Sequence, residues 1–385
     1  MPAIPSIQVS WFPALPAEGW ASMDRYWTEL DRCEKARSPK SGVTASAPAW
    51  LGGPPERSAA AGRLSRALHK HYLYPRRASR EKADIAHVLD HSYAHLIPHL
   101  RHGCRKVIAT VFDLVPLQMP EGMSPAQVER FRRTVLHLNQ ADHLISISQE
   151  TKVRLHELLG IPPERVTVAR PGMDFARFQS LVPSQNLIAQ RLRGMPKILL
   201  SVGSAIPRKN LGSLPGIFSH FKEEFLQGHC VFVRAGERLP HDLRRKFEEV
   251  IGSAGLVELG PIFGDDLIAA YQSAWVFLFP STLEGLTFTI PEAMAAGCAV
   301  VTNRSTANPE AAGEAALFYN EGDTATAAKH IVSLLKDDML HEDLSQRGQD
   351  RAREMSWEVH YETVLEVYRA VGGQPAAMAF EKSAA

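Results

Sequence analysis

Two glutamates in one short stretch are spaced to bind opposite ends of a ligand. The stretch "EGLTFTIPE" (284–292) places Glu284 and Glu292 eight positions apart, with no charged residue between them. Pro291 favours the first turn of a helix, where the helix dipole stabilises the Glu292 carboxylate by about 0.3–1 kcal/mol without any ligand. Helix capping therefore explains Glu292 taken alone. Glu284 precedes this helix beside Gly285, which allows a ligand to approach the backbone closely, so a binding role is the sharper interpretation.

Two adjacent cations, Arg208 and Lys209, occur in an earlier loop, "GSAIPRKN" (203–210), which follows an apolar run. The planar fork of arginine and the point charge of lysine suit a diphosphate that gains negative charge as it leaves. We expect Asn210 to cap the helix that follows. A ligand with a diphosphate, a ribose and a sugar would satisfy both cations and both glutamates, with its phosphates at the later helix start. A solvated basic turn remains the alternative for this loop.

Short apolar runs bounded by Gly, Pro, Ser or Asn alternate with helical stretches, as expected of strands that are buried on both faces. In the second half the runs span residues 197–204, 230–236, 256–260, 275–281, 298–303 and 315–319. In the first half they span residues 7–12, 85–89, 106–113, 143–148 and 166–172. Such alternation predicts an α/β fold with doubly wound parallel sheets, in which ligands bind at the carboxyl ends of strands.

The chain is predicted to form two Rossmann-like domains that face a central cleft. We place the first at residues 1–185 and the second at 186–355, followed by a helix and a loose tail over 356–385. The stretch from 36 to 65 is rich in Pro, Gly, Ser and Ala, so we expect it to be irregular. Residues 173–195 are expected to connect the domains. The last predicted helix has one apolar face, which contains Tyr361, Val364, Leu365 and Tyr368.

Composition excludes several classes of protein. The 385 residues are 45% hydrophobic, enough for two cored domains, and 43 Lys and Arg balance 42 Asp and Glu. This balance gives no general attraction to nucleic acid, so no nucleic-acid partner is expected. The four cysteines lack metal or redox spacing, and we see no signal peptide or membrane-spanning run. We therefore expect a cytoplasmic protein.

Several ordered motifs resemble those of family 4 glycosyltransferases, which are retaining enzymes of the GT-B fold. The segment "FPSTLEGLTFTIPEAMAAGCAVVTNRSTANPEAAGEAALFYNEGD" resembles the signature of the family, and "SVGSAIPRKNL" resembles its phosphate-binding loop. The segment "LVELGPIFGDDLIAAYQSAWVFLFPS" is similar to the part that cradles the nucleotide base. In the first half, "TVFDLVPL" and "ISISQETKVRLHELLGIPPERVTVARPGMD" also resemble family segments. The resemblance runs from about residue 84 to 370.

The resemblance implies catalytic roles for four residues. Arg208 and Lys209 would neutralise the diphosphate of a nucleotide-sugar donor, and Glu284 would bind hydroxyls of the donated sugar. Asp113, at the carboxyl end of a first-half strand, would face the reacting centre. The alternative interpretation is that Asp113 is a turn residue at the end of the strand.

The same resemblance implies the binding residues for the rest of the donor. Glu292 would contact the ribose, and backbone around Val257 and Leu259 would contact the base. Backbone amides near the helix start would hold the sugar and phosphate, and these belong to Gly285, Leu286 and Thr287. The domain 1–185 would then bind the acceptor and 186–355 the donor, with the last helix crossing back to the first domain.

Two positions depart from the family pattern. Phe112 stands where the family often has a histidine, and Leu286-Thr287 stands where it often has Phe-Gly. His91 or His95 are candidates for the missing histidine, although a structural role is the simpler interpretation of each. No Asp-x-Asp triplet occurs, so we expect no metal cofactor, and the cations would do the electrostatic work of a metal. The family implies front-face substitution with retention.

The acceptor side has a basic segment, 57–82, with eight Lys or Arg residues against Glu81 alone. Such a segment, with its interleaved tyrosines, suits an anionic membrane or a phosphorylated acceptor such as a lipopolysaccharide core. A solvated basic face is the alternative. Residues 19–22 are expected to form a second turn near the phosphates.

The leading hypothesis is a glycosyltransferase that uses a GDP-, UDP- or similar sugar. Its acceptor would be a glycan or a lipid-linked sugar in bacterial cell-surface polysaccharide or lipopolysaccharide synthesis. One version of this hypothesis is a mannosyltransferase. The alternatives are a GT-B-like nucleotide-sugar epimerase or hydrolase, and a catalytically silent nucleotide-binding scaffold.

Overall fold

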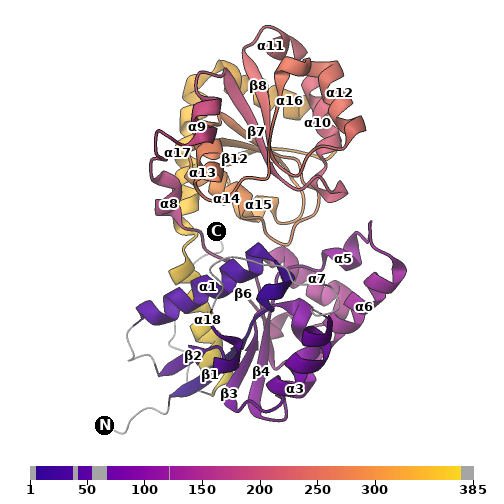
Figure 1. Ribbon diagram of the computed structural model, residues 1–385, viewed down its shortest axis with the longest axis vertical. Helices are drawn as coiled ribbons and strands as arrows, with labels where there is room; N and C mark the ends of the chain where they lie inside the picture. Colours follow the sequence, from indigo (N-terminus) through magenta and orange to yellow (C-terminus); the bar gives the residue numbers. More distant parts are fainter. Residues whose placement is uncertain (1–5, 38–41, 54–66, 121, 374–385) are drawn as a thin grey trace. The chain divides into compact units, whose positions relative to one another are not determined.

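The computed structural model describes residues 6–37, 42–53, 67–120 and 122–373, which form two compact α/β units (Figure 1). One unit comprises Met1–Gly172 with Trp357–Ala385, and the other comprises Met173–Ser356. The last helix, α18 (Trp357–Val371), groups with the first unit. The division of the chain at 172 lies earlier than the boundary at 185 inferred from the sequence.

The first unit is built on a parallel six-stranded sheet with the order β2-β1-β3-β4-β5-β6. Its strands are β1 (Ile7–Phe12), β2 (Val43–Ser46), β3 (Ala83–Val88), β4 (Cys104–Val111), β5 (His143–Ser146) and β6 (Val166–Val168). Its α-helices are α1 (Ala21–Ala36), α3 (Tyr74–Ala78), α4 (Ile97–Leu100), α5 (Val115–Gln118), α6 (Pro125–Leu136), α7 (Gln149–Leu159) and α18. Shorter turns are η1 (Pro16–Glu18), η3 (Ala49–Leu51), η5 (His91–Leu96), η6 (His137–Gln140), η7 (Pro163–Arg165) and the π-helical η4 (His69–Leu73).

The second unit has the same design, with the strand order β12-β11-β10-β7-β8-β9. Its strands are β7 (Lys197–Gly203), β8 (Cys230–Gly236), β9 (Leu256–Gly260), β10 (Val276–Phe279), β11 (Ala299–Asn303) and β12 (Ala316–Tyr319). Its α-helices are α8 (Phe175–Gln179), α9 (Leu187–Leu192), α10 (Leu214–Ser219), α11 (Lys222–Leu226), α12 (His241–Ile251), α13 (Asp265–Ser273), α14 (Thr289–Ala295), α15 (Asn308–Ala312), α16 (Thr324–Lys336) and α17 (Asp338–Glu354). Short turns are η8 (Pro207–Lys209), η9 (Leu211–Ser213) and η10 (Ser253–Gly255).

Side chains that point alternately to the two faces of each strand explain why helices cover both faces of the second sheet. On β10, Phe277 and Phe279 pack into one buried cluster, whereas Val276 and Leu278 pack into another. Successive side chains of a strand point to opposite faces, so an unbroken apolar run needs a hydrophobic layer on each side. The doubly wound arrangement predicted from these runs is confirmed.

The prediction of secondary structure from the sequence was wrong for part of the first unit. The stretch from 36 to 65 was expected to be irregular, yet it contains the strand β2, in which Val43 and Ala45 are buried. This strand has four residues and pairs only with β1 at the edge of the sheet, so its hydrophobic pattern is too short to recognise. The expected connection, 173–195, contains α8 and α9 within the second unit.

Among the described residues, no helix is long and apolar enough to cross a membrane.

A chain of buried hydrogen bonds ties α18 to the first sheet. Trp11 Nε1 donates to Tyr368 Oη at 2.8 Å, and Tyr368 Oη lies 2.7 Å from His87 Nδ1. His87 Nε2 lies 2.8 Å from Thr110 Oγ1, which lies 3.2 Å from Tyr26 Oη. These groups come from β1, β3, β4, α1 and α18, so one polar chain crosses most of the first unit's core.

The far end of this chain sets the direction of its protons. Tyr26 Oη lies 3.1 Å from His360 Nε2, and His360 Nδ1 donates to Arg170 O at 3.2 Å. With Nδ1 of the neutral ring protonated, Nε2 must accept from Tyr26 Oη. Each hydroxyl group in this series of hydrogen bonds therefore donates in the direction of His360. Burial lowers the pKa of His87 to about 3 and that of His360 to about 4, which keeps both rings neutral at pH 7.

Tyr368→Phe should destabilise the first unit by about 1–3 kcal/mol, because the Trp11 N–H and His87 Nδ1 would both lose a buried partner. The midpoint of urea unfolding at pH 7 measures this loss. Tyr72→Phe is the matched control, since Tyr72 is 57% exposed and its change should stay within about 0.5 kcal/mol. Equal midpoints of urea unfolding for the two variants would contradict a structural role for these buried hydrogen bonds.

Candidate functional site

The topology of the second sheet brings together loops that are far apart in the sequence. Strand β7 ends at Gly203 and leads to Arg208 and Lys209, whereas β10 ends at Phe279 and leads to Glu284. The two strands are parallel neighbours in the sheet. Carboxyl ends of parallel strands meet at one edge, so the cations and the carboxylate emerge side by side.

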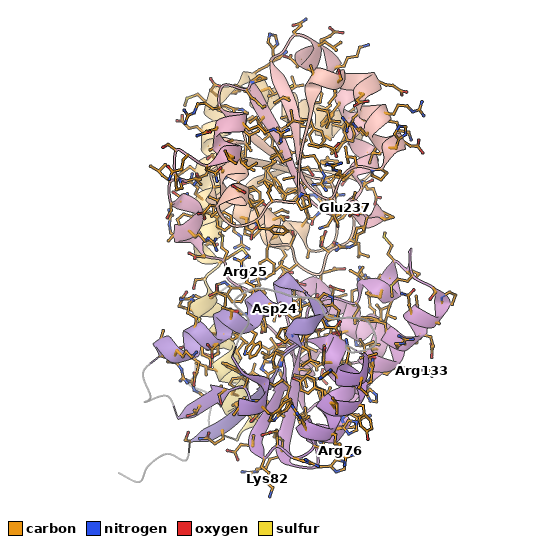
Figure 2. The ribbon with its side chains drawn as sticks, in the orientation of Figure 1. Asp24, Arg25, Arg76, Lys82, Arg133 and Glu237 are labelled. Carbon is orange, nitrogen blue, oxygen red and sulfur yellow. The ribbon has the colours of Figure 1, made fainter. Side chains whose placement is uncertain are left out.

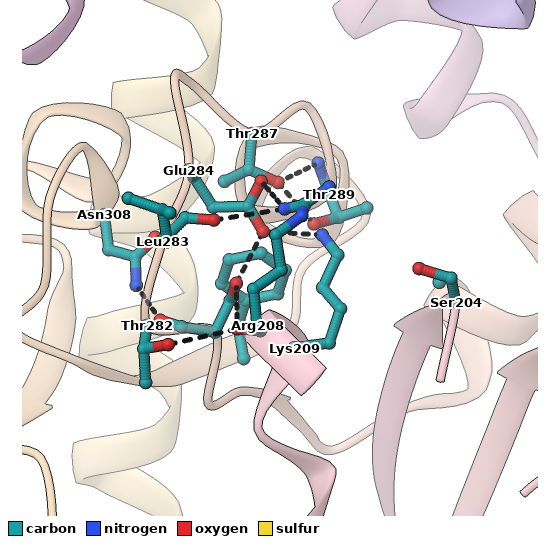
Figure 3. A network of polar contacts seen from close by, with 12 residues as sticks. Ser204, Arg208, Lys209, Thr282, Leu283, Glu284, Thr287, Thr289 and Asn308 are labelled. Atoms are coloured by element: carbon teal, nitrogen blue, oxygen red, sulfur yellow. Dashed lines mark hydrogen bonds and ion pairs between the residues drawn. The ribbon is translucent and has the colours of Figure 1, made fainter. Parts of the chain in front are cut away.

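Glu284 is clamped between both cations, as Figure 3 shows. Arg208 Nη1 donates to Glu284 Oε2 at 2.7 Å, and Lys209 Nζ donates to Glu284 Oε1 at 2.6 Å. Arg208 Nη1 also donates to Leu283 O at 3.1 Å. The side chains of Glu284 and Lys209 are only 8% and 14% exposed, while that of Arg208 is 25% exposed. Sequence reasoning named all three residues but did not predict that they pair with one another.

Competing electrostatic effects keep this network charged. Burial disfavours the ionised form of Glu284, but the charges of Lys209 and Arg208 outweigh burial and lower the pKa of Glu284 below its usual value. Burial also lowers the pKa of Lys209, an effect that Glu284 opposes. Two cations share one carboxylate, so the network keeps a net positive charge that an anionic ligand can neutralise.

The backbone of the two loops is locked together beneath the charged network. Thr282 N donates to Arg208 O at 2.9 Å, and Glu284 N donates to Thr306 Oγ1 at 3.0 Å. The Ser281 hydroxyl lies 2.5 Å from Glu284 Oε1 and 3.0 Å from Arg208 O. The Ser281 hydroxyl has a single proton, so it donates to either Glu284 Oε1 or Arg208 O. It therefore keeps an acceptor if Glu284 moves.

Asn210 does not cap the following helix with its side chain, contrary to our expectation. It instead adopts a left-handed conformation with φ of 49°, and it forms the corner between η8 and η9. Asparagine tolerates this conformation better than most residues do. The turn at Asn210 ends η8 directly after Lys209, the second of the two cations.

Arg234 is a site-forming residue that the sequence reasoning missed. It lies on β8 and is 1% exposed, and it donates to the carbonyls of Ser201 at 3.2 Å and Ser204 at 3.0 Å. Burial lowers the pKa of Arg234 to about 10, so it stays charged at pH 7. It thereby ties down the backbone that leads from β7 into the cation loop. An arginine within the apolar run "CVFVRAG" was the available signal.

A close backbone contact accompanies Arg234 at the same edge. A Cβ atom at Gly236 would lie 2.0 Å from Gly203 O, and Gly236 has a φ of 121°. Both features require glycine at this position. The carboxyl ends of β7 and β8 therefore approach each other more closely than any side chain would permit.

Glu292 is held by a different partner from those of Glu284. It lies in α14 with 7% exposure, and Tyr271 Oη donates to its Oε2 at 3.3 Å. At the start of the same helix, Thr289 N donates to Thr287 Oγ1 at 3.2 Å. The threonine that departs from the family pattern therefore takes a local capping role. Gly285 and Leu286 lie partly exposed in the loop before it.

The predicted base-binding segment contains an irregularity in strand β9. Arg234 pairs with Glu258 and Ala235 pairs with Gly260, so Leu259 is left out of the ladder between β8 and β9. The side chains of Val257 and Leu259 are partly buried against the core of the second unit. A bulge leaves backbone groups unpaired by the sheet, and bulges are common next to ligand sites.

Asp113 lies directly after β4 in the first unit. Its Oδ1 accepts from Val115 N at 3.0 Å, the local turn contact that the simpler interpretation predicted, and this contact leaves the other carboxylate oxygen for a ligand. The buried Phe112 packs against Tyr26 with ring centroids 5.0 Å apart. His91 Nδ1 accepts from Phe112 N at 3.4 Å, so His91 lies beside the position where the family often has histidine.

His95 is held elsewhere, because its Nε2 donates to Lys70 O at 2.9 Å. Burial lowers the pKa of His95 to about 4, so the ring is neutral at pH 7. This arrangement is that of a structural histidine. The expected turn over 19–22 joins η1 to α1, and Gly19 there has a φ of 72°.

The basic side chains of segment 57–82 that the structure describes have different surroundings. The first three arginines of the segment, at 57, 63 and 66, lie outside the described residues. Lys70 forms an ion pair with Glu18 at 3.3 Å, and the Arg77 guanidinium lies 5.6 Å from the centre of the Trp50 ring. Arg76 and Lys82 extend outward near the start of β3, as Figure 2 shows.

Among the described residues, no group of three or more His, Cys, Asp or Glu side chains is arranged to hold a metal ion. The site in the second unit instead presents the two cations of the network and the backbone of the surrounding loops.

Two α/β units, each built on a parallel six-stranded sheet, are the design of the GT-B glycosyltransferases. Family models match both halves of the chain: the one described as Glycosyltransferase Family 4 matches residues 36–177, and the one described as Glycosyl transferases group 1 matches residues 196–337. The chain belongs to the family 4 glycosyltransferases.

Curated relatives have low but extended similarity to the chain. It is 25% identical over 291 residues to the O-antigen chain mannosyltransferase B of Escherichia coli, covering 74% of this chain and 75% of that protein. It is 26% identical over 260 residues to the serotype-specific mannosyltransferase WbdA of Escherichia coli, of which it spans only 32%.

Solved structures support the fold. Sucrose-phosphate synthase from Thermosynechococcus elongatus matches with a TM-score of 0.71 and 16% identity, over 95% of this chain and 99% of that one. The Anabaena protein HepE, in complex with UDP and glucose, matches with a TM-score of 0.71 and 14% identity, over 94% and 100%. WaaG, a glycosyltransferase involved in lipopolysaccharide biosynthesis, matches with a TM-score of 0.65 and 14% identity, over 94% and 99%.

Glu284→Gln should destabilise the second unit at pH 7 by about 3–5 kcal/mol, because the cations would lose their buried counter-charge. The folded-state pKa of Glu284 lies below its usual value of 4.5, so its stabilisation is present above about pH 4.5 and is lost as the pH falls further. Urea unfolding at several pH values should therefore show the difference from wild type narrowing below about pH 4.5.

Glu249→Gln is the matched control, since Glu249 is 57% exposed and pairs with Arg245 on the surface. Its unfolding midpoint should stay close to that of wild type. A Glu284→Gln protein as stable as this control at pH 7 would contradict the proposed clamp.

Proposed function

We propose that this protein is a retaining, metal-independent glycosyltransferase that takes its sugar from a nucleoside diphosphate donor. The observation that carries the proposal is the network of Arg208, Lys209 and Glu284 at the carboxyl edge of the second sheet. The acceptor is a glycan or a lipid-linked sugar of a bacterial cell-surface polysaccharide or lipopolysaccharide. Mannose is the sugar favoured by the names of the relatives, two of which are O-antigen or serotype-specific mannosyltransferases.

The network suits a diphosphate leaving group. As the bond to the sugar breaks, negative charge grows on the departing phosphate oxygens, and preorganised cations stabilise that charge. Arg208 and Lys209 are already partly desolvated and are held beside one another by Glu284, so both positive charges are in place before the donor binds. Because the sequence has no Asp-x-Asp triplet, we assign the neutralisation of the diphosphate to these two side chains.

Glu284 exchanges partners when the donor binds. In the structure its oxygens accept from Arg208, Lys209 and Ser281. Once phosphate oxygens occupy the two cations, the carboxylate becomes available to accept hydrogen bonds from sugar hydroxyls. The same acid thus holds the cations ready before binding and positions the sugar afterwards.

We assign the remaining donor contacts to residues of the same unit. Glu292, held by Tyr271, binds the ribose hydroxyls, and the backbone of the bulged Leu259 with that of Val257 binds the base. Backbone groups of Gly285, Leu286 and Thr287 contact the sugar and phosphate. Recognition by backbone explains why the base leaves little trace in the side chains.

Retention follows from front-face substitution. The acceptor hydroxyl attacks the sugar on the side from which the diphosphate leaves, and a phosphate oxygen of the leaving group takes its proton. Arg208 and Lys209 then stabilise the departing diphosphate, and Asp113 orients the reacting sugar. No protein carboxylate needs to act as a nucleophile in this scheme.

A peripheral membrane contact fits the exposed part of the basic segment. Leu68 and Tyr72 are 54% and 57% exposed, and Arg76, Arg80 and Lys82 are exposed on the same segment. Apolar side chains next to cations favour an anionic lipid surface. We therefore propose that the protein works in the cytoplasm at the inner face of the membrane.

Thermal-shift measurements with GDP, UDP, ADP and dTDP and their sugar conjugates, with and without magnesium, test the donor site. One nucleotide should stabilise the folded protein by about 2.7 kcal/mol at 100 times its dissociation constant, without need of the metal. A response that requires magnesium would contradict metal independence. No response to any of these ligands would overturn the donor site itself.

Lys209→Met should weaken binding of the responding nucleotide and transfer of its sugar at least about tenfold, or roughly 1.4 kcal/mol, because a phosphate-binding charge is lost. Lys222→Met, on the exposed surface of α11, is the control and should behave as wild type. Product analysis by NMR should show retention at the anomeric carbon, and inversion would contradict the front-face scheme.

A further inference from the structure

A cavity of ≈ 600 Å³ lies wholly within the first unit. It is formed where β1 leads into η1 and α1, where β3 leads into η5, and by the face of α6, with η4 on another side. Its polar and aromatic lining includes Glu18, Trp20, Lys70, His71, Ser92 and Arg130. This volume is in the range of small-molecule sites, and the cavity follows the carboxyl ends of two strands.

Lys70 is preorganised at one wall of the cavity. Its Nζ lies 4.2 Å from the centre of the Tyr93 ring and 4.9 Å from that of Trp20, and its side chain is 15% exposed. Glu18 Oε1 lies 3.3 Å from this Nζ and also accepts from Tyr93 Oη at 3.1 Å. The ammonium group is therefore held in one position by two aromatic rings and one carboxylate.

The local backbone places a second basic residue beside Lys70. His69–Leu73 forms a π-helical turn, a rare conformation that is frequent at functional sites. The turn carries both Lys70 and His71, and His71 lines the cavity. Burial and the charges of Lys70 and Arg130 lower the pKa of His71, so its ring is neutral at pH 7 and can either donate or accept a hydrogen bond.

A second permanent cation and an unused hydroxyl come from α6 and η5, which also line the cavity. Arg130 lies on α6, where it is exposed and lines the cavity. Ser92 Oγ is buried and, in the described part of the chain, has no hydrogen-bond partner. Such a group is unusual in folded proteins and marks a place where a ligand or water would bind.

Charge and shape together indicate the kind of ligand. Lys70 and Arg130 supply two positive charges against the single carboxylate of Glu18 among the lining residues, so the cavity has an excess of positive charge. A phosphate ester accepts from arginine, lysine and hydroxyl groups at once. Trp20 is 38% exposed and offers a flat apolar surface for a sugar ring.

We propose that this cavity binds a phosphate group carried by the sugar acceptor, with Lys70, Arg130 and Ser92 on the phosphate and Trp20 against the sugar ring. This inference rests on the proposed glycosyltransferase function and names the chemical class of its acceptor. The anion site is independent of the donor network, since its residues belong to the first unit and the network belongs to the second.

Isothermal titration of the purified full-length protein with mannose 6-phosphate, inorganic phosphate and mannose tests the site. Mannose 6-phosphate should bind most tightly, inorganic phosphate more weakly, and mannose at least tenfold more weakly than its phosphate. Binding of inorganic phosphate as tight as that of mannose 6-phosphate would identify a simple ion site and overturn the sugar contact. Equal binding of mannose and its phosphate, or no binding of any probe, would overturn the anion site.

Arg130→Gln should weaken mannose 6-phosphate binding at least tenfold, which corresponds to about 1.4 kcal/mol. Arg133→Gln is the matched control on the same helix, because Arg133 is exposed, pairs with Glu129 and does not line the cavity (Figure 2). Ser92→Ala should also weaken phosphate binding while leaving mannose binding unchanged. Wild-type affinity in both Arg130→Gln and Ser92→Ala would overturn the assignment.

Two cross-checks separate this inference from the donor site. Lys209→Met should bind mannose 6-phosphate as wild type does, and loss of binding there would place the probe in the donor network instead. Arg130→Gln should keep the thermal shift with the responding nucleotide. If the nucleotide shift persists in wild type while no sugar phosphate binds, the acceptor site fails and the donor site stands.

Discussion

A carboxylate that remains ionised in a nearly buried position is the interaction on which the second unit's site depends. Taking Glu284 out of water disfavours its charge, and the adjacent charges of Lys209 and Arg208, with the hydrogen bonds from Lys209 and Ser281, reverse that effect. The three groups therefore depend on one another: without the acid the cations repel each other, and without the cations burial would raise the pKa of the acid. Because two cations share one acid, the cluster retains an excess of positive charge. The site is thereby stable without ligand and still attracts an anion.

The surrounding structure serves to bring these charges to one place. Arg234 and the close contact of Gly236 with Gly203 hold the end of β7, and Thr282 joins the two loops through Arg208 O. The first unit repeats the principle with a different ligand chemistry, since its cavity also follows the carboxyl ends of parallel strands. There the Lys70 ammonium lies against two aromatic rings and pairs with Glu18, whereas in the second unit two cations share the carboxylate of Glu284. The proposed donor site and the proposed acceptor site thus both follow carboxyl ends of parallel strands, each within its own unit.

Much of the architecture was accessible from the sequence, and the failures have a common cause. Long apolar runs such as 197–204 and 230–236 were correctly read as strands, because burial on both faces leaves an unbroken pattern. The strand β2 was missed because four residues at the edge of a sheet carry little pattern. Arg234 was missed because local sequence does not reveal that carbonyls of a neighbouring strand surround it. The cavity around Lys70 was missed because its walls come from four separate segments.

The sequence by itself determined the element types, the two-sheet design, the family resemblance and the identities of Arg208, Lys209 and Glu284, because these depend on local pattern and spacing. Only the tertiary structure decided that Glu284 pairs with both cations, because the contact joins residues that are 75 or more positions apart. It likewise decided that Lys70 belongs to a cavity and not to a uniform basic face. Such contacts follow from strand order, and strand order is set by packing across the whole unit instead of by any short stretch of the chain.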